Sequence, residues 1–243
     1  MIELHKLRKS YDGGRVWAVD DLSLTVRPGE IFGFLGPNGA GKTTTLRMMA
    51  GILTPDAGRV VIDGIDMAER PLEAKRRIGF VPDTPEVYER LTGLEYLRFL
   101  ADVYGVDARR RRERIERLAG VFELEPALGD RIASYSHGMR QKLVLIGALL
   151  HDPPVWILDE PMVGLDPRST HELKNLMHEH AAAGRTVFFS THLLDVAERL
   201  CHRVAIIQKG RLIACGTLEE LRAQAAAGSG TLESLFLELT HHD

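Results

Sequence analysis

Short runs of alternating apolar and polar residues open the chain and predict a small β-region over residues 2–35. The last of these runs, residues 31–35, is almost entirely apolar, which is typical of a central strand buried on both faces. A glycine-rich loop follows at residues 36–41, and then a run of helix-forming residues that stops at Gly51. The pattern therefore predicts a buried strand, a glycine loop and a helix in succession.

The middle of the chain has a different pattern. From about residue 84 to 150 no strand is evident, and the Thr92-x-x-Glu95 capping box and residues 108–122 predict helices. Beyond residue 150, helical patterns alternate with apolar runs that predict strands at residues 155–158, 187–190 and 204–207. Strands that alternate with helices form parallel sheets, so we expect an α/β fold with a helical insertion.

Net charge and the lengths of the apolar runs disfavour nucleic-acid binding and membrane insertion, but they do not identify a function. The formal net charge of −3 over 243 residues gives no general field for binding nucleic acid. The arginines of residues 109–112 invite that hypothesis, but Glu113 and Glu116 alternate with arginines on the same predicted helix and favour a solvated, ion-paired face. The longest apolar run, residues 143–150, is far shorter than the ~20 residues of a membrane helix. We therefore expect no nucleic-acid partner and no direct membrane insertion.

Two cysteines, Cys201 and Cys215, form no C-x-x-C pair, and the N-terminus has no leader pattern. Both observations fit a reducing compartment better than a disulfide-stabilised secreted protein. We expect a cytoplasmic chain, so that any transport role would need a separate membrane-embedded partner.

The strongest chemical signal is Gly36-x-x-x-x-Gly41-Lys42-Thr43, the P-loop pattern, between a predicted buried strand and a predicted helix. Glycines let backbone N–H groups converge on phosphate oxygens, and the helix N-terminus favours the same anion. Lys42 would neutralise the β- and γ-phosphates, Thr43 would offer its hydroxyl to Mg²⁺, and Thr44 would touch the α-phosphate. The candidate nucleotide-binding residues are Gly36, Pro37, Asn38, Gly39, Ala40, Gly41, Lys42, Thr43 and Thr44. A glycine-rich turn with a coincidental lysine is the alternative, which the flanking strand and helix disfavour.

A pair of acids ends the predicted strand at residues 155–158. Asp159 and Glu160 would lie at the carboxyl edge of the sheet, where open α/β folds bind ligands. Asp159 would hold Mg²⁺, largely through water, and Glu160 would act as the general base on the attacking water. Taken alone, the pair could equally be a helix cap and a solvated side chain.

With further landmarks in the same order, the sequence resembles the ATP-binding cassette (ABC) ATPases over nearly its whole length. Tyr11 stands where the family stacks an aromatic ring on adenine, and Val16 is in the same loop. Residues 136–141 look like a variant of the signature motif, residues 164–167 like the loop that contacts the opposite protomer, and His192 like the switch histidine. Alone, each has a plainer interpretation: a strand aromatic, a helix cap or a structural histidine. Their ordered combination with the P-loop reverses that preference.

The resemblance implies a P-loop NTPase parallel-sheet core with an N-terminal antiparallel β-subdomain and an inserted α-helical subdomain at about residues 84–150. It places the ATPase domain at residues 1–220 and a C-terminal helical tail, with a flexible stretch near residues 228–230, at 221–243. It also implies a head-to-tail pair of subunits, identical or related, that sandwiches two ATP beneath membrane-spanning subunits at the inner face of the membrane. Ser136 and Gly138 would contact the γ-phosphate held by the partner subunit, while Lys42, Glu160 and His192 would perform hydrolysis.

One position departs from the family pattern. After the strand at residues 78–82, most members carry a glutamine that touches Mg²⁺, and here Asp83 stands in its place. Aspartate is one methylene shorter and adds negative charge, so Asp83 is a candidate metal contact, with a loop residue that no longer reaches the metal as the alternative. A carboxylate here and the ending at residues 232–240 both resemble bacterial exporter-type subunits.

The sequence thus predicts a transport-coupled ATPase that acts in export. A soluble cassette ATPase that switches on ribosomes or DNA is the alternative, although such proteins usually join two cassettes or insert long coiled coils. A regulator that closes on ATP without turnover is a third candidate, disfavoured by Glu160 and His192.

Overall fold

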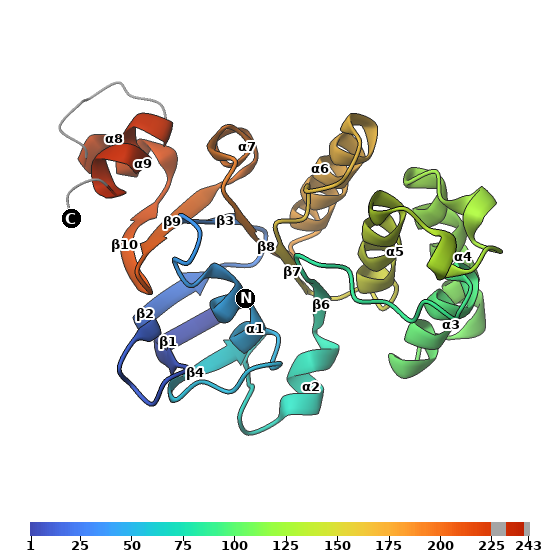
Figure 1. Cartoon of the computed structure of the whole chain (residues 1–243), viewed down its shortest axis with the longest axis horizontal. Coiled ribbons are helices and arrows are strands. Elements are labelled where there is room, and N and C mark those ends of the chain that lie inside the picture. The colour runs from blue at the N-terminus through green and yellow to red at the C-terminus, as the bar shows by residue number, and fades with distance from the viewer. Residues whose placement is uncertain (225–231, 241–243) are drawn as a thin grey trace.

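The computed structural model describes residues 1–224 and 232–240. Residues 228–230, for which the sequence predicts flexibility, lie outside the described residues. Within the described chain, ten strands form a four-stranded and a six-stranded sheet, and helices surround them (Figure 1). The expected mixed α/β fold is confirmed.

The four-stranded sheet is antiparallel and has the strand order β2-β1-β4-β5. Its strands are β1 (Ile2–Ser10), β2 (Trp17–Val26), β4 (Ala57–Ile62) and β5 (Ile65–Asp66). The sequence pattern missed β4 and β5, although the signal was present. Asp63 and Gly64 join these strands with φ values of 50° and 78°, both in the left-handed region that a tight hairpin turn requires.

The six-stranded sheet has the order β10-β9-β3-β8-β7-β6. Its strands are β3 (Ile31–Leu35), β6 (Ile78–Val81), β7 (Val155–Asp159), β8 (Thr186–Thr191), β9 (Arg203–Gln208) and β10 (Arg211–Gly216). Neighbouring strands from β9 to β6 run parallel, as the alternation with helices predicts. The sequence reading missed the antiparallel edge strand β10, which follows β9 through Lys209 and Gly210 with φ values of 47° and 80°. A Lys-Gly turn is a weaker hairpin signal than Asn-Gly or Asp-Gly.

The helices fill the segments between the strands and reach the C-terminal region. They are α1 (Lys42–Met49), α2 (Pro71–Arg76), α3 (Gly93–Val103), α4 (Ala108–Val121), α5 (His137–Leu149), α6 (Pro167–Ala182), α7 (Leu194–Leu200), α8 (Leu218–Gln224) and α9 (Leu232–Thr240), with short 3₁₀ turns at η1 (Glu125–Ala127) and η2 (Ile132–Ser134). The predicted capping box is confirmed: Glu95 N–H donates to the Thr92 hydroxyl, and Thr92 N–H donates to the Glu95 carboxylate. Both bonds satisfy N–H groups that a helix start otherwise leaves without partners.

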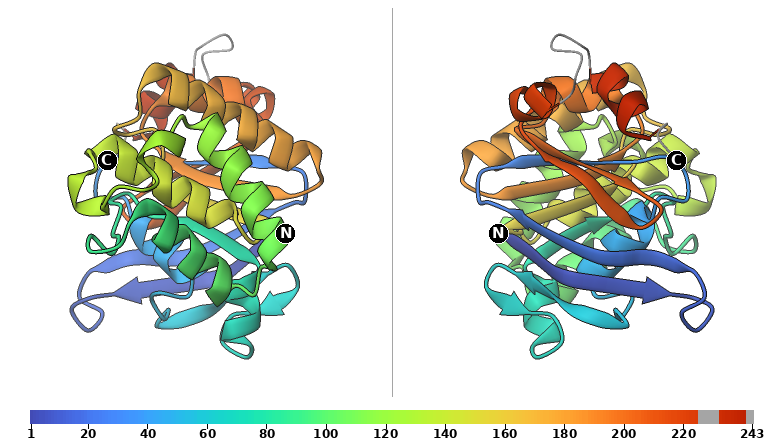
Figure 2. Two further views of the ribbon diagram at one scale, coloured as in Figure 1. Left: turned by 90° about the vertical axis from the view of Figure 1, so that its right-hand side faces the viewer. Right: turned by 90° about the vertical axis from the view of Figure 1, so that its left-hand side faces the viewer.

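The helices α3, α4 and α5 gather on one side of the molecule, between β6 and β7 in the chain (Figure 1). This arrangement agrees with the predicted helical insertion, while the boundaries at residues 84, 150 and 220 stay predictions. Figure 2 shows the antiparallel sheet on one side of the six-stranded sheet and α6 and α7 on the other.

The six-stranded sheet is covered on both faces, so its central strands β3, β7 and β8 are buried at every position and are mostly apolar. All five residues of β3 and of β7 are buried. One face packs on α1 and the antiparallel sheet, where Phe32 and Phe188 stack with ring centroids 5.6 Å apart. The other face packs on α5 and α6 around Trp156. Full burial of each large apolar side chain contributes about 1.5–3 kcal/mol, which gives the phosphate loop a rigid base.

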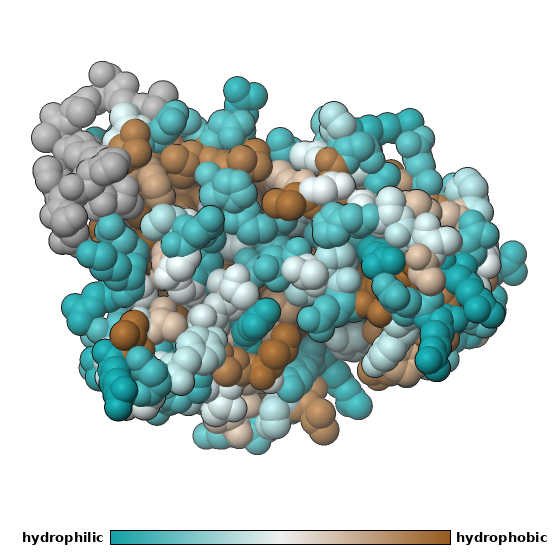
Figure 3. Space-filling model, in the orientation of Figure 1, coloured by the Kyte–Doolittle hydropathy of each residue, from teal (hydrophilic) through white to brown (hydrophobic). Residues whose placement is uncertain are grey.

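Apolar side chains reach the surface over α1, α2 and α3, among polar ones (Figure 3). Exposed large apolar residues within or next to α1, α2 and α3 include Ile52, Leu72, Tyr88, Phe99 and Val103. Among the described residues, no helix has both the length and the apolar character needed to cross a bilayer.

Candidate functional site

The glycine loop between β3 and α1 has the backbone shape that a phosphate site requires. Gly39 and Gly41 have φ values of 79° and 103°, in the region that favours glycine. A Cβ at Gly41 would come within 2.3 Å of the carbonyl oxygen of Ala18, so a side chain cannot fit there. The carbonyl of Ala40 accepts a hydrogen bond from Gly210 N–H at 3.0 Å, which ties the loop to the turn between β9 and β10.

A cavity of about 270 Å³ lies over this loop. The residues that line it are Ala18, Pro37, Asn38, Gly39, Ala40, Gly41, Lys42, Thr43, Thr44, Asp83, Asp159 and Glu160. The loop residues follow β3, Asp83 follows β6, and the acid pair ends β7, so three parallel strands bring their carboxyl ends together here. The structure thus brings the predicted phosphate loop and all three predicted acids into one cavity.

Lys42 is buried, and among the described residues its hydrogen bonds go to backbone carbonyls rather than to an acid. Its ammonium donates to the carbonyl oxygens of Gly36 at 2.7 Å and Pro37 at 3.3 Å, and it lies 3.9 Å from a carboxylate oxygen of Glu160. Burial lowers the pKa of Lys42, while Glu160 and Asp159 oppose that shift. The ammonium is therefore positioned under the loop, where an anionic ligand would improve its electrostatic environment.

Asp159 and Glu160 are held by different partners. Asp159 is buried and accepts hydrogen bonds from the hydroxyls of Ser190 and Thr43, and burial raises its pKa against these two bonds. Glu160 has a φ of 45°, which is uncommon for a residue with a side chain. One of its carboxylate oxygens lies 3.0 Å from Nδ1 of His192, and the other faces Lys42. The predicted general base is therefore between a histidine and the phosphate-loop lysine.

Tyr11, Val16, Ser136 and Gly138, also predicted to contact the nucleotide, are not among the described residues that line this cavity. Tyr11 and Val16 are 66% and 69% exposed, and the Tyr11 hydroxyl lies 3.3 Å from the Thr44 hydroxyl. Ser136 is an exposed N-cap whose hydroxyl accepts from Met139 N–H at 3.3 Å, and Gly138 is in the first turn of α5. Within the described part of the chain, none of these four side-chain positions lines the cavity.

The structure also connects the signature segment to the acid pair, which the sequence did not suggest. The buried amide of Gln141 donates to the carbonyl of Pro161 at 3.3 Å. Lys142 pairs with Asp166 at 2.9 Å, and the ring of His137 packs over the Cα of Gly164. Helix α5 is thereby joined at three points to the loop that follows Glu160.

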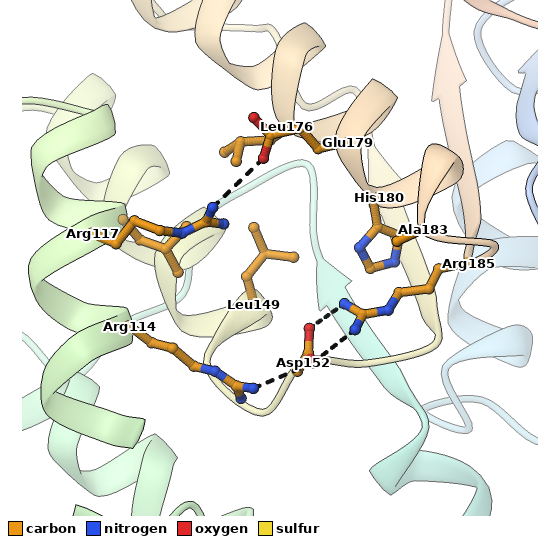
Figure 4. Close-up of a pocket in the computed structure, with 10 residues that line it drawn as sticks. Arg114, Arg117, Leu149, Asp152, Leu176, Glu179, His180, Ala183 and Arg185 are labelled. Carbon is orange, nitrogen blue, oxygen red and sulfur yellow. Dashed lines mark hydrogen bonds and ion pairs between the residues drawn. The ribbon is translucent and has the colours of Figure 1, made fainter. Parts of the chain in front are cut away.

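A different cavity lies at the opposite edge of the sheet, between α4, α6 and the starts of β7 and β8 (Figure 4). Arg114 and Arg185 both pair with Asp152, and Arg117 pairs with Glu179. Arg114 also donates to the Leu150 carbonyl at 2.6 Å. These contacts attach the helical region to the core, and each arginine already has an acidic partner.

The ABC transporter family profile matches residues 19–163 of the sequence, more than half of the chain. The chain belongs to the ABC transporter family. Nod factor export ATP-binding protein I of Paraburkholderia xenovorans (strain LB400) is 42% identical over 222 residues, which cover 91% of this chain and 72% of the relative. The ABC-type transporter ATP-binding protein EcsA of Bacillus subtilis (strain 168) is 38% identical over 223 residues, which cover 92% and 90%.

Solved structures agree with this membership. An ATP-binding subunit of an ABC transporter, 37% identical, superposes with a TM-score of 0.94 over 99% of both chains. A dimeric ATP-binding cassette in a post-hydrolysis state bound to ADP and Pi, 26% identical, superposes with a TM-score of 0.82 over 90% of this chain and 99% of the other. This ABC ATPase is accordingly an ATP-binding subunit that hydrolyses ATP to ADP and phosphate.

Proposed function

We propose that this ABC ATPase works as a head-to-tail dimer that closes on two ATP and drives export through separate membrane-spanning subunits. One observation carries the dimer: among the described residues, the cavity gathers Lys42, Asp159 and Glu160 but not Ser136 or Gly138. Those two signature residues lie at the start of α5, with the Ser136 hydroxyl free to face another chain apart from its cap bond. A second subunit would supply them to the γ-phosphate.

Hydrolysis is assigned to the groups that surround the cavity. Lys42 would leave its carbonyl partners in part and neutralise the charge of the β- and γ-phosphates. Glu160 would orient the attacking water and accept its proton, because its carboxylate lies at the end of β7 beside the lysine. His192, 3.0 Å from that carboxylate, would keep it directed at the water and would contact the γ-phosphate. Tyr11 and Val16 would contact the adenine from their exposed loop.

The donor set of the cavity fits Mg²⁺. Among the described residues that line it, three carboxylates face one ammonium, so an ATP anion would meet net negative charge without a cation. Thr43 and Asp159 offer hard oxygen ligands, and Mg²⁺ in nucleotide sites typically takes one or two such ligands and completes its shell with phosphates and water. When bound, the ion neutralises phosphate charge and orients the nucleotide. Asp83 is a candidate contact through its carboxylate.

The surface for the membrane-spanning partner is assigned to α3 and the loop at residues 83–91. Tyr88 and Phe99 lie exposed there with ring centroids 5.8 Å apart, and Val103 is 57% exposed. A cavity of about 280 Å³ adjoins them between α1, α3, α5 and β6. An apolar surface beside Asp83 suits a docking segment that senses the nucleotide site.

Export, rather than import, is supported by the names of the relatives. Two are a Nod factor export protein and a probable multidrug transporter protein of Escherichia coli (strain K12), the latter 36% identical over 244 residues, which cover 99% of this chain and 42% of the relative. Asp83 in place of the usual glutamine and the ending at residues 232–240 both resemble exporter-type subunits, which also supports export.

The decisive test is the size of the purified chain with Mg²⁺-ATP, compared between the wild type and Glu160→Gln. Removal of the proton acceptor should reduce hydrolysis by about 100-fold or more and trap an ATP-dependent dimer. Glu179→Gln is the matched control, because it makes the same change on α6 at the opposite edge. The sandwich is contradicted if Glu160→Gln hydrolyses ATP at the wild-type rate. It is also contradicted if Glu160→Gln stays monomeric with ATP and Ser136→Ala leaves the rate of hydrolysis unchanged.

A further inference from the structure

The hydroxyl of Ser190 joins both members of the acid pair. Ser190 is fully buried on β8, directly opposite Asp159 in the parallel ladder. Its O–H donates to the Asp159 carboxylate, and its oxygen accepts from the backbone N–H of Glu160 at 3.0 Å. The backbone N–H of Glu160 can only donate, so the Ser190 oxygen accepts from it. The single proton of the serine hydroxyl is then given to the Asp159 carboxylate.

The backbone at Glu160 needs such support. Its φ of 45° lies in the left-handed region, which costs a residue with a Cβ about 1 kcal/mol or more. Strand β7 ends at Asp159, so Glu160 is the first residue beyond the regular ladder. The hydrogen bond to Ser190 is what pairs the Glu160 N–H at this point.

The same strand end holds Glu160 at a second point. Ser190 lies on β8, and His192 follows directly after the last residue of that strand, Thr191. Ser190 contacts the backbone of Glu160, and His192 contacts its carboxylate at 3.0 Å. The orientation of the carboxylate is thus set from its backbone and from its tip.

We propose that Ser190 is a positioning residue whose hydroxyl holds Glu160 in the conformation that directs its carboxylate at the attacking water. This inference rests on the proposed function, in which Glu160 is the general base. Ser190 touches neither ATP nor water in this role. Its effect passes through the backbone of Glu160.

A purely structural role predicts a different pattern of effects. Thr186 provides the comparison, because it is another fully buried hydroxyl on β8, at the other end of the strand, where it donates to the Arg27 carbonyl at 3.3 Å. If buried hydroxyls of β8 served only stability, loss of either one would change unfolding and leave turnover similar. The positioning role predicts that only the Ser190 change alters kcat.

The experiment measures steady-state ATP hydrolysis of the full chain for Ser190→Ala, Ser190→Thr and Thr186→Val, with thermal unfolding of each. Ser190→Ala should lower kcat about 10- to 100-fold and leave the KM for ATP within about threefold, because a misplaced base costs turnover rather than binding. Ser190→Thr keeps the hydroxyl and suits a strand, so it should return kcat to within about threefold of the wild type. Thr186→Val should leave kcat within about twofold.

Testing Ser190→Ala in both the wild-type and the Glu160→Gln chain separates this inference from the proposed function on which it rests. In Glu160→Gln, Ser190→Ala should add less than about twofold, since its route through Glu160 is already lost. The positioning role is wrong if Glu160→Gln abolishes turnover while Ser190→Ala alone keeps the wild-type kcat. It is also wrong if Ser190→Ala lowers kcat as much in the Glu160→Gln chain as in the wild type. If Glu160→Gln itself turns over normally, the proposed function fails. Should Ser190→Ala not fold, Ser190→Cys replaces it, and wild-type kcat in that variant overturns the role.

Discussion

Strands β7 and β8 carry polar clusters at both ends, and the two clusters differ in how their charges are balanced. At the carboxyl ends lie Asp159, Glu160 and His192, beside the phosphate loop. At the amino ends lie Asp152 and Arg185, beside α4 and α6 (Figure 4). Since the same two strands support both clusters, the difference between them does not come from the fold.

At the amino edge, partners within the chain balance the charges. Asp152 pairs with both Arg114 and Arg185, and these arginines lower the pKa of its carboxyl. One strand further along the sheet from β8, Glu30, directly before β3, accepts from Arg27 N–H at 2.6 Å and pairs with Arg203 at 3.2 Å. Such pairs contribute modestly to stability and leave little for a ligand to improve.

At the carboxyl edge, partners within the described chain balance the charges only in part. Burial raises the pKa of Asp159, with Asp83 and Glu160 adding to the shift, and burial lowers the pKa of Lys42. Each shift means that the folded chain disfavours the charged form of that group. A bound nucleotide, together with the Mg²⁺ proposed above, would supply opposite charges for these groups, so the charges at this edge favour binding and catalysis over stability of the empty protein.

Substitution of Lys42 should show most clearly how the carboxyl edge differs from the amino edge. Lys42→Met should reduce ATP hydrolysis by about 100- to 1,000-fold, because the phosphate charge loses its ammonium partner. The free energy of unfolding without nucleotide should not fall, because the buried ammonium is disfavoured in the folded state. Hydrolysis assays and urea unfolding of the nucleotide-free chain measure both quantities.

Asp152→Asn is the matched control for Lys42→Met at the amino edge. It should leave hydrolysis within about twofold and lower the free energy of unfolding by about 1–2 kcal/mol, because two partly exposed arginines lose their partner. A Lys42→Met chain that is destabilised as much as Asp152→Asn would contradict the contrast between the edges.

Acid should weaken the fold through two histidines near the amino edge. Burial lowers the pKa of His180, beside Arg185 and Asp152, and of His151, beside Arg114 and Asp152, each to about 4. The unfolded chain protonates them near pH 6.5, so stability is full above that pH and falls as pH drops toward 4. Each histidine should contribute about 2–3 kcal/mol to the loss, measured by urea unfolding across this range.

The control for the acid effect is on the same helix. His178 is exposed on α6, two residues from His180. His180→Gln should flatten the dependence of stability on pH between 6.5 and 4. His178→Gln makes the same change at an exposed position and controls for the loss of an imidazole from α6. Equal slopes for the wild type and His180→Gln would show that His180 takes up no proton on unfolding.

Local patterns in the sequence predicted the parts of the site that follow one another in the chain. The P-loop between its strand and helix, and the acids after an apolar run, need only short-range signals. The role of Ser190 was missed because its partners are 30 and 31 residues away and depend on the register of β7 with β8. Likewise, nothing local shows that Gln141 reaches Pro161. The roles predicted for Ser136, Gly138 and Tyr11 stay predictions, since they involve a ligand or a second chain.

The smallest effect is expected at Asp83, where the carboxyl edge has a charge that the family pattern replaces with glutamine. Asp83 lines the cavity, and its charge helps to raise the pKa of Asp159. Asp83→Gln should therefore raise the Mg²⁺ concentration for half-maximal hydrolysis about threefold, because the cation loses one attractive charge, and should leave kcat within about threefold. Glu86→Gln, a similar change in the same loop outside the lining of the cavity, should alter neither quantity. If Asp83→Gln leaves both quantities unchanged, Asp83 is a loop residue that the metal does not sense, and the incomplete balance at this edge belongs to Asp159 and Glu160 alone.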